Sequence, residues 1–226
     1  MKVAIIGGTG FVGLHITRHL LAAGHVPRLL VRPGSESRVE QSASCEIVHG
    51  DVNDLSSLVE CVRGCDAVIY LIGILREFPA QGITFEALQY QGVVDTIAAA
   101  QENCVGRFIL MSANGIRPDG TAYQRTKYRA EQALKDSGLH WTIFRPSVIF
   151  GDAEGRMEFC SQLKKDIIDS PLPAPLFHAG LLPTKAGLFE LAPVSIKDVA
   201  DAFVLALSES RTESQTYSLC GPERLS

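Results

Sequence analysis

The chain has 226 residues, of which 46% are apolar and 20% are charged, and this composition excludes a disordered or fibrous protein. Its formal net charge of −4 argues against a nucleic-acid partner, because nucleic-acid phosphates favour a basic surface. The longest apolar run, residues 67–75, has half the length that a membrane span needs, so we predict no membrane span and a cytoplasmic protein.

Short apolar runs alternate with segments of helical spacing through the first two thirds of the sequence. The predicted elements, in chain order, are strand 2–6, helix 11–23, strands 26–31 and 46–49, a helix from about 54 to 62, strand 67–72, helix 85–103, strand 107–111, helix 122–136 and strand 141–144. Strand 67–72 is apolar throughout, as expected when helices cover both faces of a parallel sheet. The repetition is typical of the α/β class with a Rossmann-type, doubly wound parallel sheet.

The alternation breaks after residue 150. Residues 157–168 have helical spacing, and residues 170–193 contain five of the eleven prolines. A helix over 196–207 and a strand over 216–219 follow. We therefore expect an NAD(P)-binding Rossmann domain over residues 1–150. Residues 151–226 would form a small C-terminal substrate lobe at the open end of the sheet, with its late elements returning to the sheet.

The glycine motif of residues 7–13 stands between the first strand and the first helix. Gly7 allows a tight turn, Gly10 lets the backbone approach a pyrophosphate, and Gly13 lets the helix pack on the strand. The free N–H groups at the start of the helix would then face the phosphates. A glycine turn without a ligand is the alternative, and the flanking strand and helix favour the dinucleotide. The candidate cofactor contacts of the motif are Gly7, Thr9, Gly10, Phe11, Val12 and Gly13.

The ends of the second and third strands should meet the adenosine half of the cofactor. Arg32 ends the second strand, with no acidic residue before Glu36, and an arginine there suits a 2′-phosphate. This favours NADP(H), with NAD(H) as the alternative if Arg32 is only a solvated surface charge. Asp51 and Val52 follow the third strand, where a carboxylate and main chain could bind adenine. The alternative for Asp51 is an N-cap for the next helix.

Tyr123 and Lys127 are four residues apart on a predicted helix, so they share one face. A nearby ammonium would lower the pKa of the phenol toward neutrality and could hold the nicotinamide ribose. Ser112, at the end of the fifth strand, could donate a hydrogen bond to a substrate carbonyl. A tyrosine and a lysine with this spacing also occur by chance in many helices, and the position in a nucleotide-binding fold favours catalysis.

Together with Gly-Asp-Val at 50–52 and Arg-Pro-Ser-Val-Ile-Phe-Gly at 145–151, these motifs resemble the extended or atypical short-chain dehydrogenase/reductases, the NAD-dependent epimerase/dehydratase family. The resemblance covers nearly the whole chain and is strongest to a subgroup similar to the NAD(P)H-binding accessory subunit of respiratory complex I. The segments that point to this subgroup are 70–75, 84–86, 106–113 and 193–200.

This resemblance implies several residue roles. Ser112, Tyr123 and Lys127 would form the catalytic triad. Gly73 would lie near the cofactor, and Pro146 to Val148 would flank the nicotinamide. Thr126 departs from the family, in which serine is commoner before the lysine. Family members usually continue past a Gly-Pro-Glu such as residues 221–223, so this chain is expected to lack its natural C-terminal segment.

Three functions remain open from the sequence. The first is an NAD(P)-dependent oxidoreductase, epimerase or dehydratase acting on an unidentified small molecule. The second is a nucleotide-holding accessory or assembly protein, with complex I as the partner that the resemblance implies. The third is sensing of the NADPH/NADP ratio, which would require a partner. The six cysteines and six histidines are irregularly spaced, so reduced thiols and no metal site are predicted.

Overall fold

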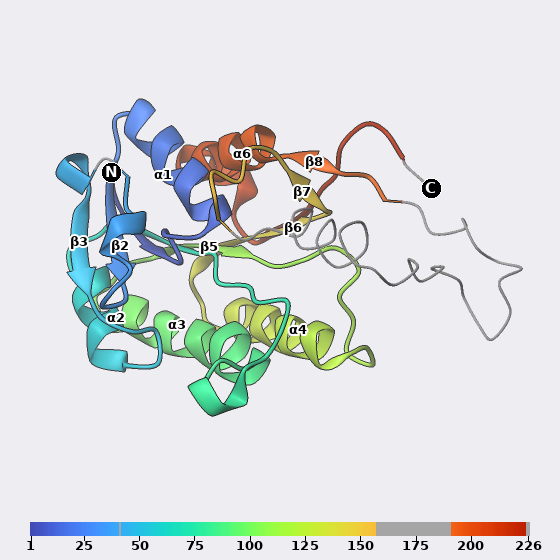
Figure 1. Ribbon diagram of the computed structural model, residues 1–226, viewed down its shortest axis with the longest axis horizontal. Helices are drawn as coiled ribbons and strands as arrows, with labels where there is room; N and C mark the ends of the chain where they lie inside the picture. Colours follow the sequence, from blue (N-terminus) through green and yellow to red (C-terminus); the bar gives the residue numbers. More distant parts are fainter. Residues whose placement is uncertain (41, 157–190, 225–226) are drawn as a thin grey trace, which may run out of the picture.

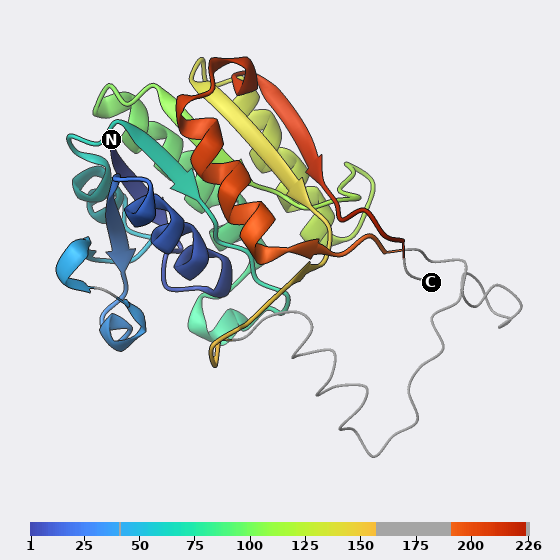
Figure 2. The same ribbon diagram turned by 90° about the horizontal axis from the view of Figure 1, so that it is seen from above.

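A seven-stranded parallel sheet organises the protein. The structure, a computed structural model, describes residues 1–40, 42–156 and 191–224. In these residues the strand order is β3-β2-β1-β4-β5-β6-β9, and every neighbouring pair is parallel (Figures 1 and 2). The strands are β1 Lys2–Ile6, β2 Val26–Val31, β3 Glu46–His49, β4 Ala67–Tyr70, β5 Arg107–Met111, β6 His140–Pro146 and β9 Gln215–Leu219. The predicted Rossmann-type α/β fold is confirmed.

Helices cover both faces of the sheet (Figure 1). One face carries α1 Phe11–Ala22 and α6 Ile196–Ser208, and the other carries α2 Leu55–Val62, α3 Gly92–Glu102 and α4 Ala122–Lys135. None of the helices within the described ranges combines the length and the apolar character needed to cross a bilayer.

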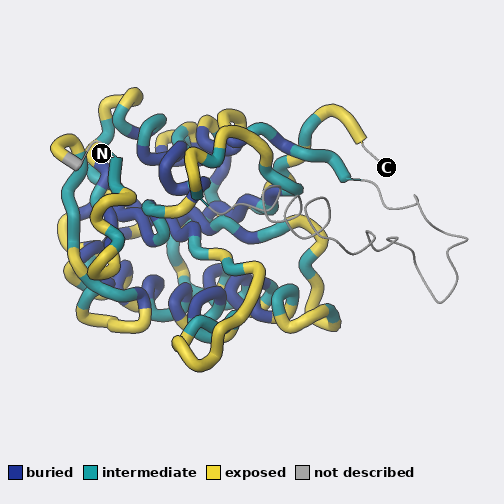
Figure 3. Tube along the Cα trace, viewed as in Figure 1, coloured by how far each residue is buried: buried dark blue, intermediate teal, exposed yellow. Residues whose placement is uncertain are grey.

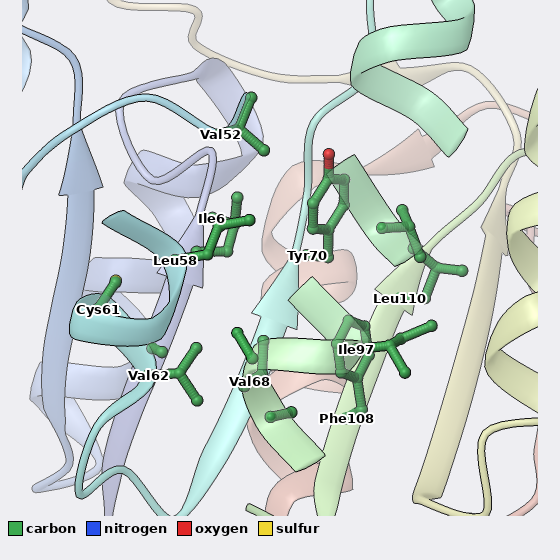
Figure 4. Packing of buried hydrophobic residues seen from close by; sticks show 14 of the residues in the cluster. Ile6, Val52, Leu58, Cys61, Val62, Val68, Tyr70, Ile97, Phe108 and Leu110 are labelled. Atoms are coloured by element: carbon green, nitrogen blue, oxygen red, sulfur yellow. The ribbon is translucent and has the colours of Figure 1, made fainter. Parts of the chain in front are cut away.

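The apolar core lies in two layers, one on each side of the sheet (Figure 3). Figure 4 shows the layer beneath α2 and α3, where Ile6, Leu58 and Phe108 are completely buried. On the other side, Ile5 and Phe203 are equally buried between the sheet and the pair α1 and α6. Burial on both faces explains why the central strands are apolar at consecutive positions instead of alternate ones.

Short elements connect the main ones. Helical turns occur at η1 Glu36–Arg38, η2 Ser42–Ser44, η3 Pro79–Gln81 and η7 Ser210–Thr212, and the two-residue strands β7 Ile149–Phe150 and β8 Val194–Ser195 pair with each other. The helix predicted over 85–103 begins instead as a π-helix, η4 Glu86–Gln91. The buried Tyr70 hydroxyl donates a hydrogen bond of 2.5 Å to the Leu88 carbonyl within this π-helix. Helical periodicity in the sequence cannot predict such a tertiary contact.

Two strand boundaries differ from prediction for reasons of pairing. β6 is longer than the predicted 141–144, because it pairs with β5 on one side and with β9 on the other. β4 ends two residues before the predicted 72. Its last ladder partner is Ile6, whose carbonyl accepts from the Leu71 N–H at 2.9 Å, and the chain then leaves the sheet. The predicted helix over 157–168 lies outside the described residues.

The described residues after 190 add to the same layers. β9 pairs with β6 over five residues, and α6 packs against α1. The sheet therefore gains an edge strand from the end of the chain. The rest of the expected substrate lobe, residues 157–190, falls outside the described ranges.

Candidate functional site

The glycine loop between β1 and α1 is built by backbone packing. Gly7 has φ = +98°, in the left-handed region that favours glycine. A Cβ on Gly13 would lie 2.4 Å from the Gly7 carbonyl oxygen and 2.6 Å from the Gly8 Cα, so α1 can approach the loop only with glycine there. Gly10 is different, because it is exposed and the nearest atom to a Cβ would be 3.4 Å away. The fold itself has no need of glycine at position 10.

Gly10 is also the N-cap of α1, and no side chain caps the helix. The first backbone N–H groups of a helix have no partner within the helix. At α1 these groups follow an exposed glycine, next to the positive end of the helix dipole. The loop can therefore accept an anion against bare backbone, as a pyrophosphate requires.

A cavity of about 990 Å³ opens in front of this loop. It extends over the carboxyl ends of β4, β5 and β6 to α4 and to the segment that follows β9. The predicted site residues that line it are Gly7, Gly10, Phe11, Val12, Gly13, Gly73, Ser112, Tyr123, Lys127, Pro146 and Val148. Residues from separate segments of the chain thus meet at one opening.

The cavity has further lining residues that sequence reasoning missed. Asn114 follows β5, and Cys220 follows β9, where its sulfur lies 3.9 Å from the Asn114 amide nitrogen. Asn114 could have been found from its position just beyond a strand end, whereas Ser147, which also lines the cavity, lies within the predicted stretch from Pro146 to Val148. Cys220 could not, because the placement of β9 beside β6 brings it there.

Four predicted residues do not line this cavity. They follow β1, β2 and β3 in the sequence and are Thr9, Arg32, Asp51 and Val52. Arg32 is exposed directly after β2, and its guanidinium has no partner within the described ranges. The Asp51 carboxylate accepts from the backbone and side-chain nitrogens of Asn53, both at 2.9 Å. The N-cap alternative for Asp51 is wrong, because Asp54 caps α2 by accepting from the Ser56 N–H. Val52 is buried, so only its backbone could meet a ligand.

Ser112 follows β5 and is only 4% exposed. Its backbone N–H donates to the Phe144 carbonyl at 2.7 Å, which holds it against β6. Its hydroxyl oxygen is buried and has no hydrogen-bond partner in the described part of the chain. An unpaired buried hydroxyl costs about 1–3 kcal/mol. The fold thus carries a polar group that a ligand oxygen could satisfy.

Lys127 is buried at the base of the cavity. Its ammonium donates to the carbonyls of Ile72 and Met111 at 3.2 and 3.0 Å. Burial lowers the pKa of Lys127 to about 8, and the negative charge of Glu131 partly opposes this change. These two carbonyls, one just beyond β4 and one at the end of β5, therefore position the charge beside Gly73, where a Cβ would lie 3.5 Å from the lysine nitrogen.

Tyr123 occupies the first turn of α4. The side chains of Thr121 and Gln124 form a capping box that fixes this turn. The Phe85 ring packs edge-on against the Tyr123 ring with centroids 5.7 Å apart. Burial raises the pKa of Tyr123. The sequence predicts that Lys127 lowers the pKa of Tyr123, and this lowering is not found in the structure. The Lys127 ammonium donates instead to the Ile72 and Met111 carbonyls.

These features fit a dinucleotide. One end of the cavity offers an uncapped helix start behind an exposed glycine, which suits a pyrophosphate. The other end gathers a buried ammonium, a phenol and an unpaired hydroxyl, which suit a ribose and a reacting oxygen. Both sets border the same cavity.

Comparison with known proteins agrees with this fit. Residues 7–167 match the NAD(P)H-binding family. Ceramide reductase of Caulobacter vibrioides is 30% identical over 153 residues, which cover 67% of this chain and 47% of that protein. The mitochondrial NADH-ubiquinone oxidoreductase 40 kDa subunit of Neurospora crassa is 26% identical over 225 residues, covering 97% of this chain and 55% of the subunit. The chain thus spans about half the length of these two curated relatives.

The fold is shared with a solved epimerase. UDP-glucose 4-epimerase of Thermus thermophilus, in complex with NAD, superposes with a TM-score of 0.77 at 20% identity, covering 100% of this chain and 79% of the epimerase. This likeness concerns the fold. The match over residues 7–167 includes the glycine loop, α4 and the cavity-lining residues up to Ile149. The chain therefore belongs to the NAD(P)H-binding family, with the Rossmann-type fold of the short-chain dehydrogenase/reductases and epimerase/dehydratases.

Proposed function

We propose that the protein is an NAD(P)-dependent oxidoreductase that prefers NADP(H) and acts on a carbonyl or hydroxyl compound through Ser112, Tyr123 and Lys127. The observation that carries this proposal is the buried, unpartnered Ser112 hydroxyl in the same cavity as the other two side chains. Leaving such a group unpaired costs stability, and a substrate oxygen would satisfy it. Polar groups of this kind gather at catalytic sites.

Each residue has a distinct task in this proposal. A bound cofactor supplies or accepts the hydride. Ser112 donates a hydrogen bond to the substrate oxygen and orients it. The raised pKa of Tyr123 keeps its phenol protonated at neutral pH, so Tyr123 can give a proton to a carbonyl oxygen during reduction. Lys127, charged below its pKa of about 8, holds the ribose hydroxyls.

The preference for NADP(H) rests on Arg32. Its exposed guanidinium stands directly after β2, where the adenosine ribose lies in this fold. With no side-chain partner within residues 1–40, 42–156 and 191–224, it is free to pair with a 2′-phosphate. Asp51 and the Val52 backbone, at the end of β3, are proposed to flank the adenine.

The test is turnover in the parent protein and in Tyr123→Phe. A panel of carbonyl compounds and sugar nucleotides is screened by NADPH absorbance, and Tyr123→Phe is then assayed on the compounds that react. The rate should fall by about 10²–10⁴, the usual contribution of a positioned acid, while NADPH affinity and melting temperature are retained. Tyr128→Phe is the matched control, because it removes a phenol from the same helix outside the cavity lining. A rate that persists in Tyr123→Phe contradicts the mechanism.

A second function has its own support. The match to the complex I subunit extends over 97% of this chain, further than the match to ceramide reductase. A nucleotide-holding accessory role would leave the glycine loop in use and Tyr123 idle. Tight NADPH binding without turnover of any compound in the panel would favour it. Complex I as a partner and the cytoplasm as the location stay predictions.

A further inference from the structure

A short segment after β7 reaches back to the glycine loop. Residues 151–156, here called the strap, lie beside α1 (Figure 1). The His15 Nε2 donates to the Asp152 carbonyl at 3.1 Å, and Arg18 forms an ion pair with Glu154 at 2.6 Å. Both partners of the strap lie in α1, the helix that begins at the glycine loop. The strap is therefore held where it can meet a ligand of that loop.

Arg156 ends the strap between two parts of the predicted ribose site. Its guanidinium reaches the Thr9 carbonyl at 3.4 Å in the glycine loop and the Arg38 carbonyl at 2.9 Å in the segment after β2. It also lies 3.4 Å from the Glu40 carboxylate, and its side chain is 11% exposed. In dinucleotide-binding folds, the glycine loop and the end of the second strand flank the adenosine ribose. Arg156 contacts the segments on both sides.

The contacts of Arg156 are weak for a guanidinium. Charge-assisted hydrogen bonds to oxygen are typically about 2.7–2.9 Å long, and only the contact with the Arg38 carbonyl is that short. The contacts with Thr9 and Glu40 are 3.4 Å long. Arginine has five N–H donors in a planar fork that matches a phosphate. A dianion placed beside Arg156 would bind these donors better than their present acceptors do.

The formal charges around Arg156 cancel, with four arginines against four carboxylates, so their pairing decides which of them can meet an anion. Glu40 is shared between Arg156 and Arg18, and Glu36 pairs with His49 at 3.5 Å. The charged residues of the strap, of α1 and of the segment after β2 are Arg18, Arg32, Glu36, Arg38, Glu40, Asp152, Glu154 and Arg156. Arg32 and Arg38 have exposed side chains without a partner in the described residues. They leave two unneutralised cations near the ribose site.

We infer that Arg156 is a specificity-determining residue for NADP(H), which binds the adenosine 2′-phosphate from the strap while Arg32 binds it from β2. The inference rests on the proposed function, because it requires a dinucleotide on the glycine loop. Glu40 is then a competitor, since its carboxylate occupies the donors that the phosphate needs. A residue 124 positions beyond Arg32 in the sequence would thus help to select the cofactor.

The test compares two ligands that differ only in the 2′-phosphate. Binding of 2′,5′-ADP and 5′-AMP to the full chain is measured by calorimetry, followed by NADP⁺ and NAD⁺. Arg156→Gln should weaken 2′,5′-ADP and NADP⁺ by at least about tenfold, and change 5′-AMP and NAD⁺ by less than about twofold. Glu40→Gln should act in the opposite direction and strengthen 2′,5′-ADP. Arg211→Gln, an exposed arginine in η7, is the control and should change neither.

The outcomes separate the inference from the proposed function. Equal weakening of all four ligands in Arg156→Gln means that Arg156 only anchors the strap, and this overturns the inference. Weaker 2′,5′-ADP binding in Glu40→Gln also overturns it, even if Arg156→Gln does not fold. A parent protein that prefers 2′,5′-ADP and keeps this preference in Arg156→Gln overturns the inference alone. A parent protein that binds 2′,5′-ADP no better than 5′-AMP overturns the NADP(H) preference as well.

Discussion

Gly10→Val should abolish dinucleotide binding without unfolding the protein. Gly10 has φ = −80° and ψ = 175°, which any residue can adopt, and it is exposed. A Cβ there would approach only the Gly7 carbonyl oxygen, at 3.4 Å. The cost to the fold is limited to the replacement of glycine at a helix N-cap, about 1 kcal/mol at most.

The cost to binding is larger. A valine at position 10 would enter the cavity where a pyrophosphate must approach the free N–H groups of α1. Each charge-assisted hydrogen bond lost is worth about 1.5–3 kcal/mol, and about 1.4 kcal/mol corresponds to a factor of ten. Loss of a single bond therefore weakens binding by about tenfold to a hundredfold, and loss of two makes binding undetectable in ordinary titrations.

Gly13→Ala is the matched contrast. Its Cβ would lie 2.4 Å from the Gly7 carbonyl oxygen, so backbone must move and the fold should lose about 1–3 kcal/mol. Calorimetry with NADPH and thermal unfolding without nucleotide measure both effects. Gly10→Val should lose affinity while its melting temperature falls by about 4 °C at most, whereas Gly13→Ala should lose stability without a steric block at the phosphate site. Unchanged NADPH affinity in Gly10→Val would refute the assignment of the loop.

Three further substitutions test other parts of the site. Arg32→Gln should weaken NADPH by about tenfold or more and leave NADH nearly unchanged, because one charged contact to phosphate contributes about 1.5–3 kcal/mol. Ser112→Ala should raise the free energy of unfolding in urea by about 1 kcal/mol, since it removes a buried unpaired hydroxyl, and should slow turnover by about 10²–10³. Lys127→Met tests a pH dependence. The pKa of Lys127 is about 8 in the folded protein, and its ordinary value is 10.5. Between these pH values, Lys127 is protonated in the unfolded chain and deprotonated in the folded chain. The unfolding free energy of the parent should therefore rise relative to Lys127→Met from pH 8 to 10.5, by up to about 3 kcal/mol, and this advantage should vanish as the pH falls below 8.

Each of these three has a result that contradicts it. Equal weakening of NADPH and NADH in Arg32→Gln would remove the basis for the cofactor preference. A destabilised Ser112→Ala would mean that the hydroxyl has a partner after all. Parallel pH profiles for the parent and Lys127→Met would mean that Lys127 titrates at its ordinary pKa in the folded protein.

The sequence alone was sufficient for features with local causes. The glycine loop was predicted because a tight turn, a bare helix start and a close strand–helix approach each require a particular residue within seven positions. Tyr123 and Lys127 were paired because helical geometry places residues four apart on one face. The central strands were recognised because burial on both faces makes them apolar at consecutive positions.

Only the tertiary structure decided features that depend on distant partners. The length of β6 is set by its partners β5 and β9, and the direction of the Lys127 ammonium is set by two carbonyls, one just beyond β4 and one at the end of β5. The missing partner of Ser112 can be recognised only once its surroundings are known. The contact of Arg156 with Thr9 joins residues 147 positions apart. Periodicity and motif spacing describe neighbours along the chain, whereas a binding site is assembled from neighbours in space.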